Sequence, residues 1–195
     1  MSRRRRHICG HPLVDLFACF LLPAYTLLFA GSREWLGTNF SVRAVLGEDY
    51  YRGFLLWGLL AGGYFFVMTT RLALTLGGVW RRLFVHMLTL TACLSLAYSV
   101  AIPYLPKYLP RWANLHVALA SGACVLFMAA LLVLLVSWRK REGCRPFWLA
   151  WGGIVLGSGL LFALGGMVTT ALEVFFTISA ALFVRKLWLW ADRNP

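Results

Sequence analysis

The chain has 195 residues, of which 61% are hydrophobic and only 13% are charged, and its formal net charge is +12. An average soluble domain is about 25% charged and about 45–50% apolar. The composition therefore excludes an ordinary soluble domain and predicts an all-α, polytopic membrane protein. A basic balance in such a protein usually reports orientation and attraction to phospholipid headgroups. The one dense basic cluster, residues 3–6, has no aromatic residues between its arginines, so we expect no nucleic-acid partner.

Residues 112–138 form an unbroken uncharged run, which lies between Arg111 and a basic triplet at 139–141. As a helix with a rise of about 1.5 Å per residue it is roughly 40 Å long, enough to cross a bilayer. A soluble helix with no charged face would have no side for water. Five further apolar runs have comparable lengths, and together the six predict a six-transmembrane-helix bundle. The five are residues 12–31, 54–70, 83–102, 147–164 and 167–184.

The predicted organisation has three parts. Residues 1–11 form a basic cytoplasmic tail, residues 12–186 form the transmembrane domain with an outer polar loop at 32–53, and residues 187–195 form a second cytoplasmic tail. A signal peptide is the alternative interpretation of the first run, because a basic start precedes it and small residues end it. The run is longer than a usual signal segment, so we interpret it as a retained helix with a kink at Pro23.

Lysines and arginines are distributed unequally between the predicted loops. With the N-terminus in the cytoplasm, the inner set is Arg3, Arg4, Arg5, Arg6, Arg71, Arg81, Arg82, Arg139, Lys140, Arg141, Arg145, Arg185, Lys186 and Arg193, and the outer set is Arg33, Arg43, Arg52, Lys107 and Arg111. The positive-inside rule therefore predicts that both termini are cytoplasmic (N-in/C-in). The expected location is integral and multi-pass, in the plasma membrane or, in a bacterium, the inner membrane.

Ionisable residues within predicted spans are costly and are candidates for function. Glu173 is the most informative of them, because small and polar residues recur on its helical face at i±3, i±4, i+7 and i+8. His116 lies at a similar depth in another span, with Asn114 close by. We predict an outward-facing intramembrane polar site, explained either by a structural hydrogen bond between helices or by a functional pocket. Its members are His116, Glu173, Asn114, Thr169, Thr170 and Thr177.

A second polar cluster is predicted at the cytoplasmic side of the spans. Asp15 lies near the start of the first span, at the level of Arg71, Arg81 and Arg82. We predict a salt bridge that joins the first helix to these arginines. His86 follows Arg82 by one helical turn and is expected at the membrane interface.

Metal, cofactor and catalytic motifs are not evident. The cysteines form no CxxC pair, and the alternate-residue spacing of His7, Cys9 and His11 is not a usual zinc pattern, even with Cys144 as a fourth ligand. His86 and His116 lie at opposite ends of their spans, which disfavours a haem pair. No nucleophile motif, Walker loop or HExxH pattern is present. We therefore expect no metal and no cofactor, and the sequence leans against an enzyme without excluding one.

Several segments resemble a known family. They are Asn39-Phe40-Ser41-Val42, which also matches the N-glycosylation acceptor pattern, then Leu46-Gly47, residues 52–63, residues 102–106 and Leu115-His116. Over residues 12–136 the chain resembles the six-helix Frag/DRAM/Sfk-like membrane proteins and their uncharacterised bacterial relatives. The resemblance implies a six-span bundle associated with lipid or membrane homeostasis. It implies no established catalytic set, and His116 is the one candidate residue that it carries over.

Three functions are compatible with these patterns. The leading hypothesis is a non-enzymatic bundle that binds or organises lipid, or regulates a membrane partner. The first alternative is a small transporter or channel with Glu173 as the coupling carboxylate. The second is an intramembrane lipid-modifying enzyme that uses His116 and Glu173 as acid and base. The expected partners are membrane lipids and a membrane-protein partner or a second copy of the chain.

Overall fold

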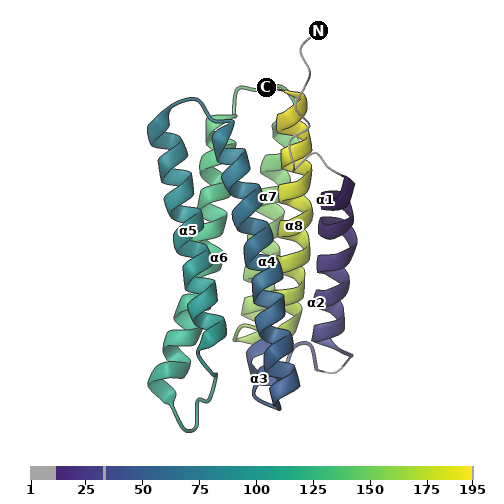
Figure 1. Cartoon of the computed structure of the whole chain (residues 1–195), viewed down its shortest axis with the longest axis vertical. Coiled ribbons are helices and arrows are strands. Elements are labelled where there is room, and N and C mark those ends of the chain that lie inside the picture. Colours follow the sequence, from purple (N-terminus) through teal and green to yellow (C-terminus); the bar gives the residue numbers. More distant parts are fainter. Residues whose placement is uncertain (1–11, 33, 195) are drawn as a thin grey trace.

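The structure, a computed structural model, describes residues 12–32 and 34–194 (Figure 1). The predicted basic tail at 1–11, with His7, Cys9 and His11, lies outside the described residues, as does Arg33. All regular elements of the described chain are helical. They are α1 (Pro12–Leu16), the π-helical turn η2 (Phe17–Leu21), α2 (Leu22–Ala30), α3 (Phe40–Ala44), α4 (Glu48–Leu74), α5 (Val79–Ala101), α6 (Pro110–Ser137), α7 (Arg145–Gly165) and α8 (Thr170–Arg193).

Six helical stretches are long and apolar enough to cross a membrane: Pro12–Ala30, α4, α5, α6, α7 and α8. The shortest has 19 residues, which at about 1.5 Å per residue is close to the roughly 30 Å thickness of the hydrocarbon core. The six run side by side along the long axis of the molecule (Figure 1). Large apolar side chains such as Leu28, Leu59 and Leu156 are more than two-thirds exposed on the outside. These features indicate a multi-pass integral membrane protein.

The helices differ in how deeply they lie in the bundle. α8 is central, packing on α2, α4 and α7, and 56% of its apolar stretch is buried. α5 and α6 form a pair on one side of α4, and the first helix lies on the opposite side (Figure 1). α7 is peripheral: only 6% of its apolar stretch is buried, and Ile154 is its one buried residue.

Glycines on α4 allow α5 to approach closely, as their four-residue spacing predicts. A Cβ atom at Gly58 would lie 3.1 Å from Cγ2 of Val100, and the Sγ of Cys93 lies 3.7 Å from the carbonyl oxygen of Gly62. Two glycines have the same spacing on α7, but only one of them lies close to another helix. A Cβ at Gly157 would collide with the ring of Phe175 on α8, whereas Gly153 faces open space.

Two helix boundaries, and the form of one irregularity, differ clearly from the sequence prediction. Residues 187–193, expected to be a tail, continue α8, because Leu187, Trp188 and Ala191 are buried against the bundle. Residues 48–53, expected in the polar loop, form the first turns of α4. The irregularity expected at Pro23 takes the form of the π-helical turn just before it, in which the amide of Leu22 donates to the carbonyl of Phe17; a π turn is a recognised cause of a helix bend.

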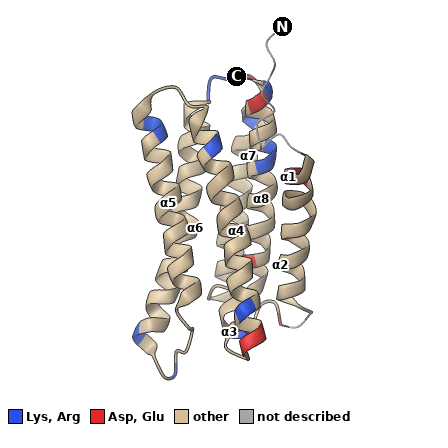
Figure 2. Ribbon diagram, in the orientation of Figure 1, with Lys and Arg blue, Asp and Glu red and all other residues tan. Residues whose placement is uncertain are grey.

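Most charged residues lie toward the two ends of the bundle (Figure 2). We call the end where α1 begins and α8 ends the basic end, and the opposite end the α3 end. Within the described chain the basic end carries Arg71, Arg81, Arg82, Arg139, Lys140, Arg141, Arg145, Arg185, Lys186 and Arg193, and the α3 end carries Arg43, Arg52, Lys107 and Arg111.

Candidate functional site

The segment between α2 and α4, residues 34–47, folds onto the α3 end of the bundle. Its helix α3 begins after Asn39, whose side-chain oxygen accepts a hydrogen bond from the amide of Val42 at 2.8 Å. This is the usual role of Asn at a helix N-cap. The ring of Phe40 is completely buried, in edge-to-face contact with Phe29 and Trp57. The middle of the 34–47 segment, residues 39–44, is therefore packed against the bundle, whereas residues 34–37 and 45–47 are exposed.

Glu173 lies in the first turn of α8 and contacts the 34–47 segment. Its Oε2 accepts a hydrogen bond from the backbone N–H of Phe40 at 2.7 Å. α8 begins at Thr170, where the hydroxyl of the N-cap residue Thr169 accepts from the amide of Leu172. The carboxyl is therefore nearer the end of the span than the sequence predicted. At this end of the helix, the positive end of the helix dipole favours an acidic group.

His116 lies on α6, is 4% exposed, and has a partner on each side of its ring. Its Nδ1 lies 2.8 Å from the carbonyl oxygen of Ser99 and 3.0 Å from that of Ile102. Because a carbonyl oxygen only accepts, Nδ1 carries the proton. In the neutral ring Nε2 then accepts from the hydroxyl of Ser41, which lies 2.6 Å away.

The two predicted ionisable residues do not bond to each other. Consecutive residues of α3 lie between them: Phe40 binds Glu173 and Ser41 binds His116. Residues 40 and 41 therefore join α8 to α6 through two separate hydrogen bonds. The direct acid–base pair that an enzyme using His116 and Glu173 requires is therefore not formed among the described residues.

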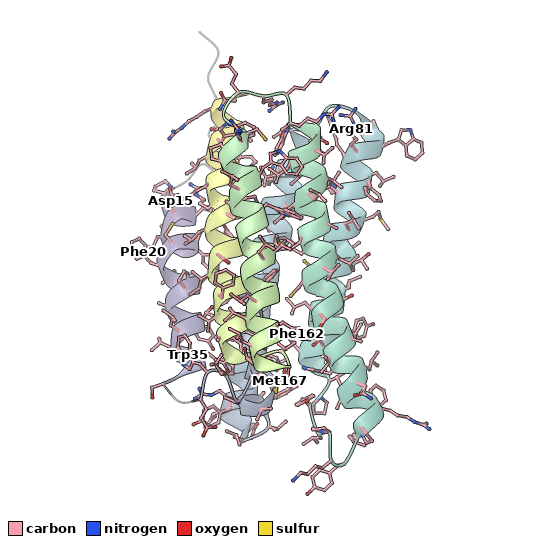
Figure 3. The ribbon with its side chains drawn as sticks, turned by 180° about the vertical axis from the view of Figure 1, so that it is seen from behind. Asp15, Phe20, Trp35, Arg81, Phe162 and Met167 are labelled. Carbon is pink, nitrogen blue, oxygen red and sulfur yellow. The ribbon has the colours of Figure 1, made fainter. Side chains whose placement is uncertain are left out.

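Backbone groups of the 34–47 segment also cap α8. The amide of Thr170 donates to the carbonyl of Thr38 at 2.7 Å, and the amide of Ala171 donates to that of Trp35 at 2.9 Å. Figure 3 shows Trp35 at this end of the bundle, near Met167. The first amides of a helix have no partner within it, so these bonds attach the segment firmly to α8.

A cavity of about 60 Å³ lies between α4, α5, α6 and α8. Small side chains, among them Ala61, Ala92 and Ala123, leave the space. Thr177 also lines it, one helical turn from Glu173 on the same face of α8. Other lining residues are partly exposed, so the cavity opens at the apolar surface of the bundle; they are Gly62, Cys93, Leu96, Cys124 and Phe176.

The predicted outward site is assembled in part. Thr169, Thr170 and Thr177 are buried on the face of α8 that carries Glu173. Asn114 is exposed on α6 and makes no side-chain hydrogen bond to the described chain.

Sequence reasoning missed Asn39, Phe40 and Ser41 as site residues. They were noted only within a family-like segment and as a glycosylation pattern. That pattern does not apply in the fold, because Asn39 is 6% exposed and its amide nitrogen donates to the carbonyl of Val168.

The predicted cytoplasmic-side cluster does not form. The salt bridge expected between Asp15 and Arg71, Arg81 or Arg82 is replaced by one to Arg185, with Oδ1 of Asp15 2.5 Å from Nε. Arg185 is 2% exposed. Because Asp15 lies on α1 and Arg185 on α8, the pair joins the first described helix to the last. Figure 3 shows Asp15 on the side of the bundle far from Arg81.

The other members of that cluster bond within their own hairpin. His86 Nδ1 lies 2.7 Å from the carbonyl oxygen of Arg82, one turn earlier in α5. The Nε of Arg82 donates to the carbonyl of Leu76 in the turn between α4 and α5, at 2.6 Å. Arg71 on α4 is partly buried, and none of the ion pairs of the described chain includes it.

Comparison with known proteins adds no assignment. No protein-family model, no curated protein and no solved structure matches the chain. The resemblance to the Frag/DRAM/Sfk-like proteins therefore rests on the sequence segments that carry it, and the function must be argued from the geometry of this bundle.

Proposed function

We propose that the protein binds a membrane lipid whose polar group reaches Glu173 and whose apolar chain enters the cavity beside Thr177. One observation carries this proposal: an apolar cavity that opens toward the bilayer lies one helical turn from a carboxyl group. A ligand that is apolar over most of its length and polar at one end is complementary to such a site.

The surroundings of Glu173 limit which polar headgroup the lipid can carry. Among the described residues, the amide of Phe40 is the hydrogen-bond donor to this carboxyl, through Oε2. The other oxygen remains available as an acceptor, and no lysine or arginine of the described chain lines the cavity to receive a phosphate. A hydroxyl headgroup, as in a diacylglycerol, meets both conditions.

The size of the cavity limits the apolar part. At about 60 Å³, it is well below the roughly 150 Å³ that admits benzene in an engineered protein. It therefore accommodates a few carbon atoms of a chain, and the remainder lies along the outer surface of the bundle.

Photocrosslinking tests the proposal. The probe is a diacylglycerol with a photoactivatable, clickable acyl chain, and the comparison is a phosphatidic acid with the same chains. We expect the diacylglycerol to label peptides of α6 and α8, and Ala123→Leu, which fills the cavity, to reduce labelling about fivefold or more. Ala118→Leu is the matched control, because Ala118 is exposed on the same helix. Equal labelling of the two variants, or stronger labelling by phosphatidic acid, would contradict the proposal.

The orientation is part of the same proposal. The basic end carries ten lysines and arginines of the described chain and the α3 end carries four, by the two sets given above. The positive-inside rule then favours a cytoplasmic basic end and an α3 end that faces outward. The lipid site consequently lies in the outer half of the membrane.

A second candidate function is acyl transfer, favoured by the pairing of Ser41 with His116. A serine hydroxyl 2.6 Å from a ring nitrogen, with the other nitrogen oriented by carbonyls, is the arrangement of a nucleophile and its base. Ser41 would attack an ester carbonyl while Nε2 takes the hydroxyl proton and returns it to the departing alcohol, which leaves the acyl group on Ser41. Both residues are buried, so a substrate reaches Ser41 only when the 34–47 segment moves away.

A fluorophosphonate probe separates the two candidates. An acyl-transfer enzyme gains the mass of one probe, and Ser41→Ala abolishes the adduct while Ser121→Ala, at an exposed serine of α6, retains it. A wild-type protein that stays unmodified in membranes is not an enzyme of this kind, and lipid binding then remains as the one proposal.

A further inference from the structure

The basic end has a surface feature that the proposed function does not use. Two adjoining hollows, of about 520 Å³ and 670 Å³, lie on the outer face of α5 and α6 and share Arg81 and Val133. They are much larger than the interior cavity near Glu173. Figure 3 shows Arg81 at the end of the bundle opposite Trp35 and Met167. We call the two hollows together the α5–α6 groove.

Three exposed cations surround the groove: Arg81 at the start of α5, and Arg139 and Lys140 just after α6. Their side chains make no hydrogen bond or ion pair within the part of the chain that the structure describes. Neither hollow is lined by an acidic residue. The groove therefore presents positive charge that the described protein does not neutralise.

Neighbouring arginines are engaged elsewhere, which distinguishes the three. Arg82 donates to the carbonyl of Leu76. Arg141 donates to the carbonyl of Asn194 and lies over the ring of Trp138. Arg81, Arg139 and Lys140 therefore differ from Arg82 and Arg141, their neighbours in the same basic stretches, in having side chains available for a ligand.

Apolar side chains continue the groove along α5. Trp80, Phe84 and Met87 follow one another at i, i+4 and i+7, so they share one helical face, and each is more than half exposed. Val133 on α6 forms the opposite wall. A tryptophan beside cations is typical of the membrane interface, and the apolar stripe runs from there along the span.

We propose that the α5–α6 groove binds an anionic phospholipid, with its phosphate among Arg81, Arg139 and Lys140 and one acyl chain along Trp80, Phe84 and Met87. The charge complementarity selects an anionic headgroup, because each basic side chain close to anionic lipid contributes about a fivefold preference. The proposal is independent of the Glu173 site, which lies at the other end of the bundle and disfavours an anionic headgroup.

Native mass spectrometry of the full chain in a mild detergent tests it, with phosphatidylglycerol and phosphatidylcholine of identical acyl chains as probes. We expect phosphatidylglycerol to bind at least tenfold more tightly. The triple variant Arg81→Gln, Arg139→Gln, Lys140→Gln should lose that preference. The control triple Arg145→Gln, Lys186→Gln, Arg193→Gln removes the same charge from exposed positions at the same end and should keep it.

Two outcomes would overturn the proposal: equal binding of the two lipids by the wild type, or an equal loss in both triple variants, which would indicate diffuse attraction to net charge. The single variants Arg81→Gln and Lys140→Gln replace the triple variant if it does not fold, and a loss of the preference for phosphatidylglycerol is then expected in each.

Trp80→Ala should weaken the binding of both lipids, because it removes a contact with the acyl chain and leaves the cations. Ala123→Leu should change neither affinity, so a failure at the interior cavity remains distinguishable from a failure here.

Discussion

The two ends of the bundle use polar groups in opposite ways. At the α3 end, His116 and Ser41 are buried and Glu173 is partly buried, and each has a hydrogen-bond partner from another element. At the basic end, Arg81, Arg139 and Lys140 are exposed and make no contact of this kind with the described chain. Buried polar groups that are paired specify how elements pack, whereas exposed cations act on what surrounds the protein. The hydrogen bonds of the first set therefore hold residues 40 and 41 in place, and the cations of the second set are available to the membrane.

Labelling of single cysteines on intact cells has the largest expected effect, because the outcome is all or none. In a background without native cysteines, Tyr108→Cys at the α3 end should react with a membrane-impermeant maleimide, and Glu142→Cys at the basic end should react only after permeabilisation. Both positions are exposed. The reverse pattern would place the basic end outside, and labelling of both would show that the ends are not on opposite sides of one membrane.

Arg185 is the exception at the basic end, since it is buried and paired with Asp15. Asp15→Leu leaves the buried guanidinium without its carboxylate and should lower the free energy of unfolding in detergent by about 2 kcal/mol, less than for a fully buried pair because the Asp15 side chain is 48% exposed. The double variant Asp15→Leu, Arg185→Met should recover at least about 1 kcal/mol of this loss, because an apolar pair of similar volume can replace a buried ion pair. If the loss of stability in the double variant equals the sum of the losses in the two single variants, the two residues contribute independently and their ion pair does not stabilise the fold.

At the α3 end, His116→Leu should release the 34–47 segment. The change leaves the Ser41 hydroxyl without its acceptor and two carbonyls without their donor, at an expected cost of about 2 kcal/mol. Maleimide labelling of Ala44→Cys, which is 5% exposed in the packed segment, should then become about tenfold faster. His86→Leu is the matched control, because His86 bonds only within α5. Equal rates in the two variants would mean that His116 does not hold the segment.

The smallest effect is expected at Glu173. Glu173→Leu removes the acceptor of the Phe40 amide and should cost about 1–2 kcal/mol. Glu173→Gln keeps a side-chain oxygen and should remain within about 0.5 kcal/mol of the wild type in the same unfolding measurement. If both variants lose the same stability, the charge of the carboxyl matters and its hydrogen bond to Phe40 does not.

The helices could be read from the sequence because membrane-spanning segments must be long, apolar and nearly free of charge. Run lengths alone predicted the six spans, and the glycine spacing on α4 predicted a close contact with a neighbouring helix. The sequence did not name that helix, which is α5, where Gly58 approaches Val100. The end of α8 was misjudged for a related reason. Arg185 and Lys186 indicated a boundary, yet the helix continues to Arg193 because Leu187 and Trp188 pack on the bundle.

The site could be read only in part. Glu173 and His116 were identified because ionisable residues are rare in spans, but their partners lie 133 and 75 residues away in the chain. Helical periodicity relates residues within one helix and carries no information on such contacts. The bond to Phe40 also uses a backbone amide, which no residue type reveals. The same limit explains why Asp15 was assigned to the nearby loop arginines and not to Arg185.

The ion pair between Asp15 and Arg185 also constrains how the protein is made. The two residues are 170 positions apart, and they join the first helix of the described chain to the last. Until synthesis reaches α8, Pro12–Ala30 has none of its α8 contacts, and a nascent chain stalled before residue 185 lacks the arginine altogether. Assembly of this bundle therefore includes a late closure step, in which a segment made early docks against one made 170 residues later.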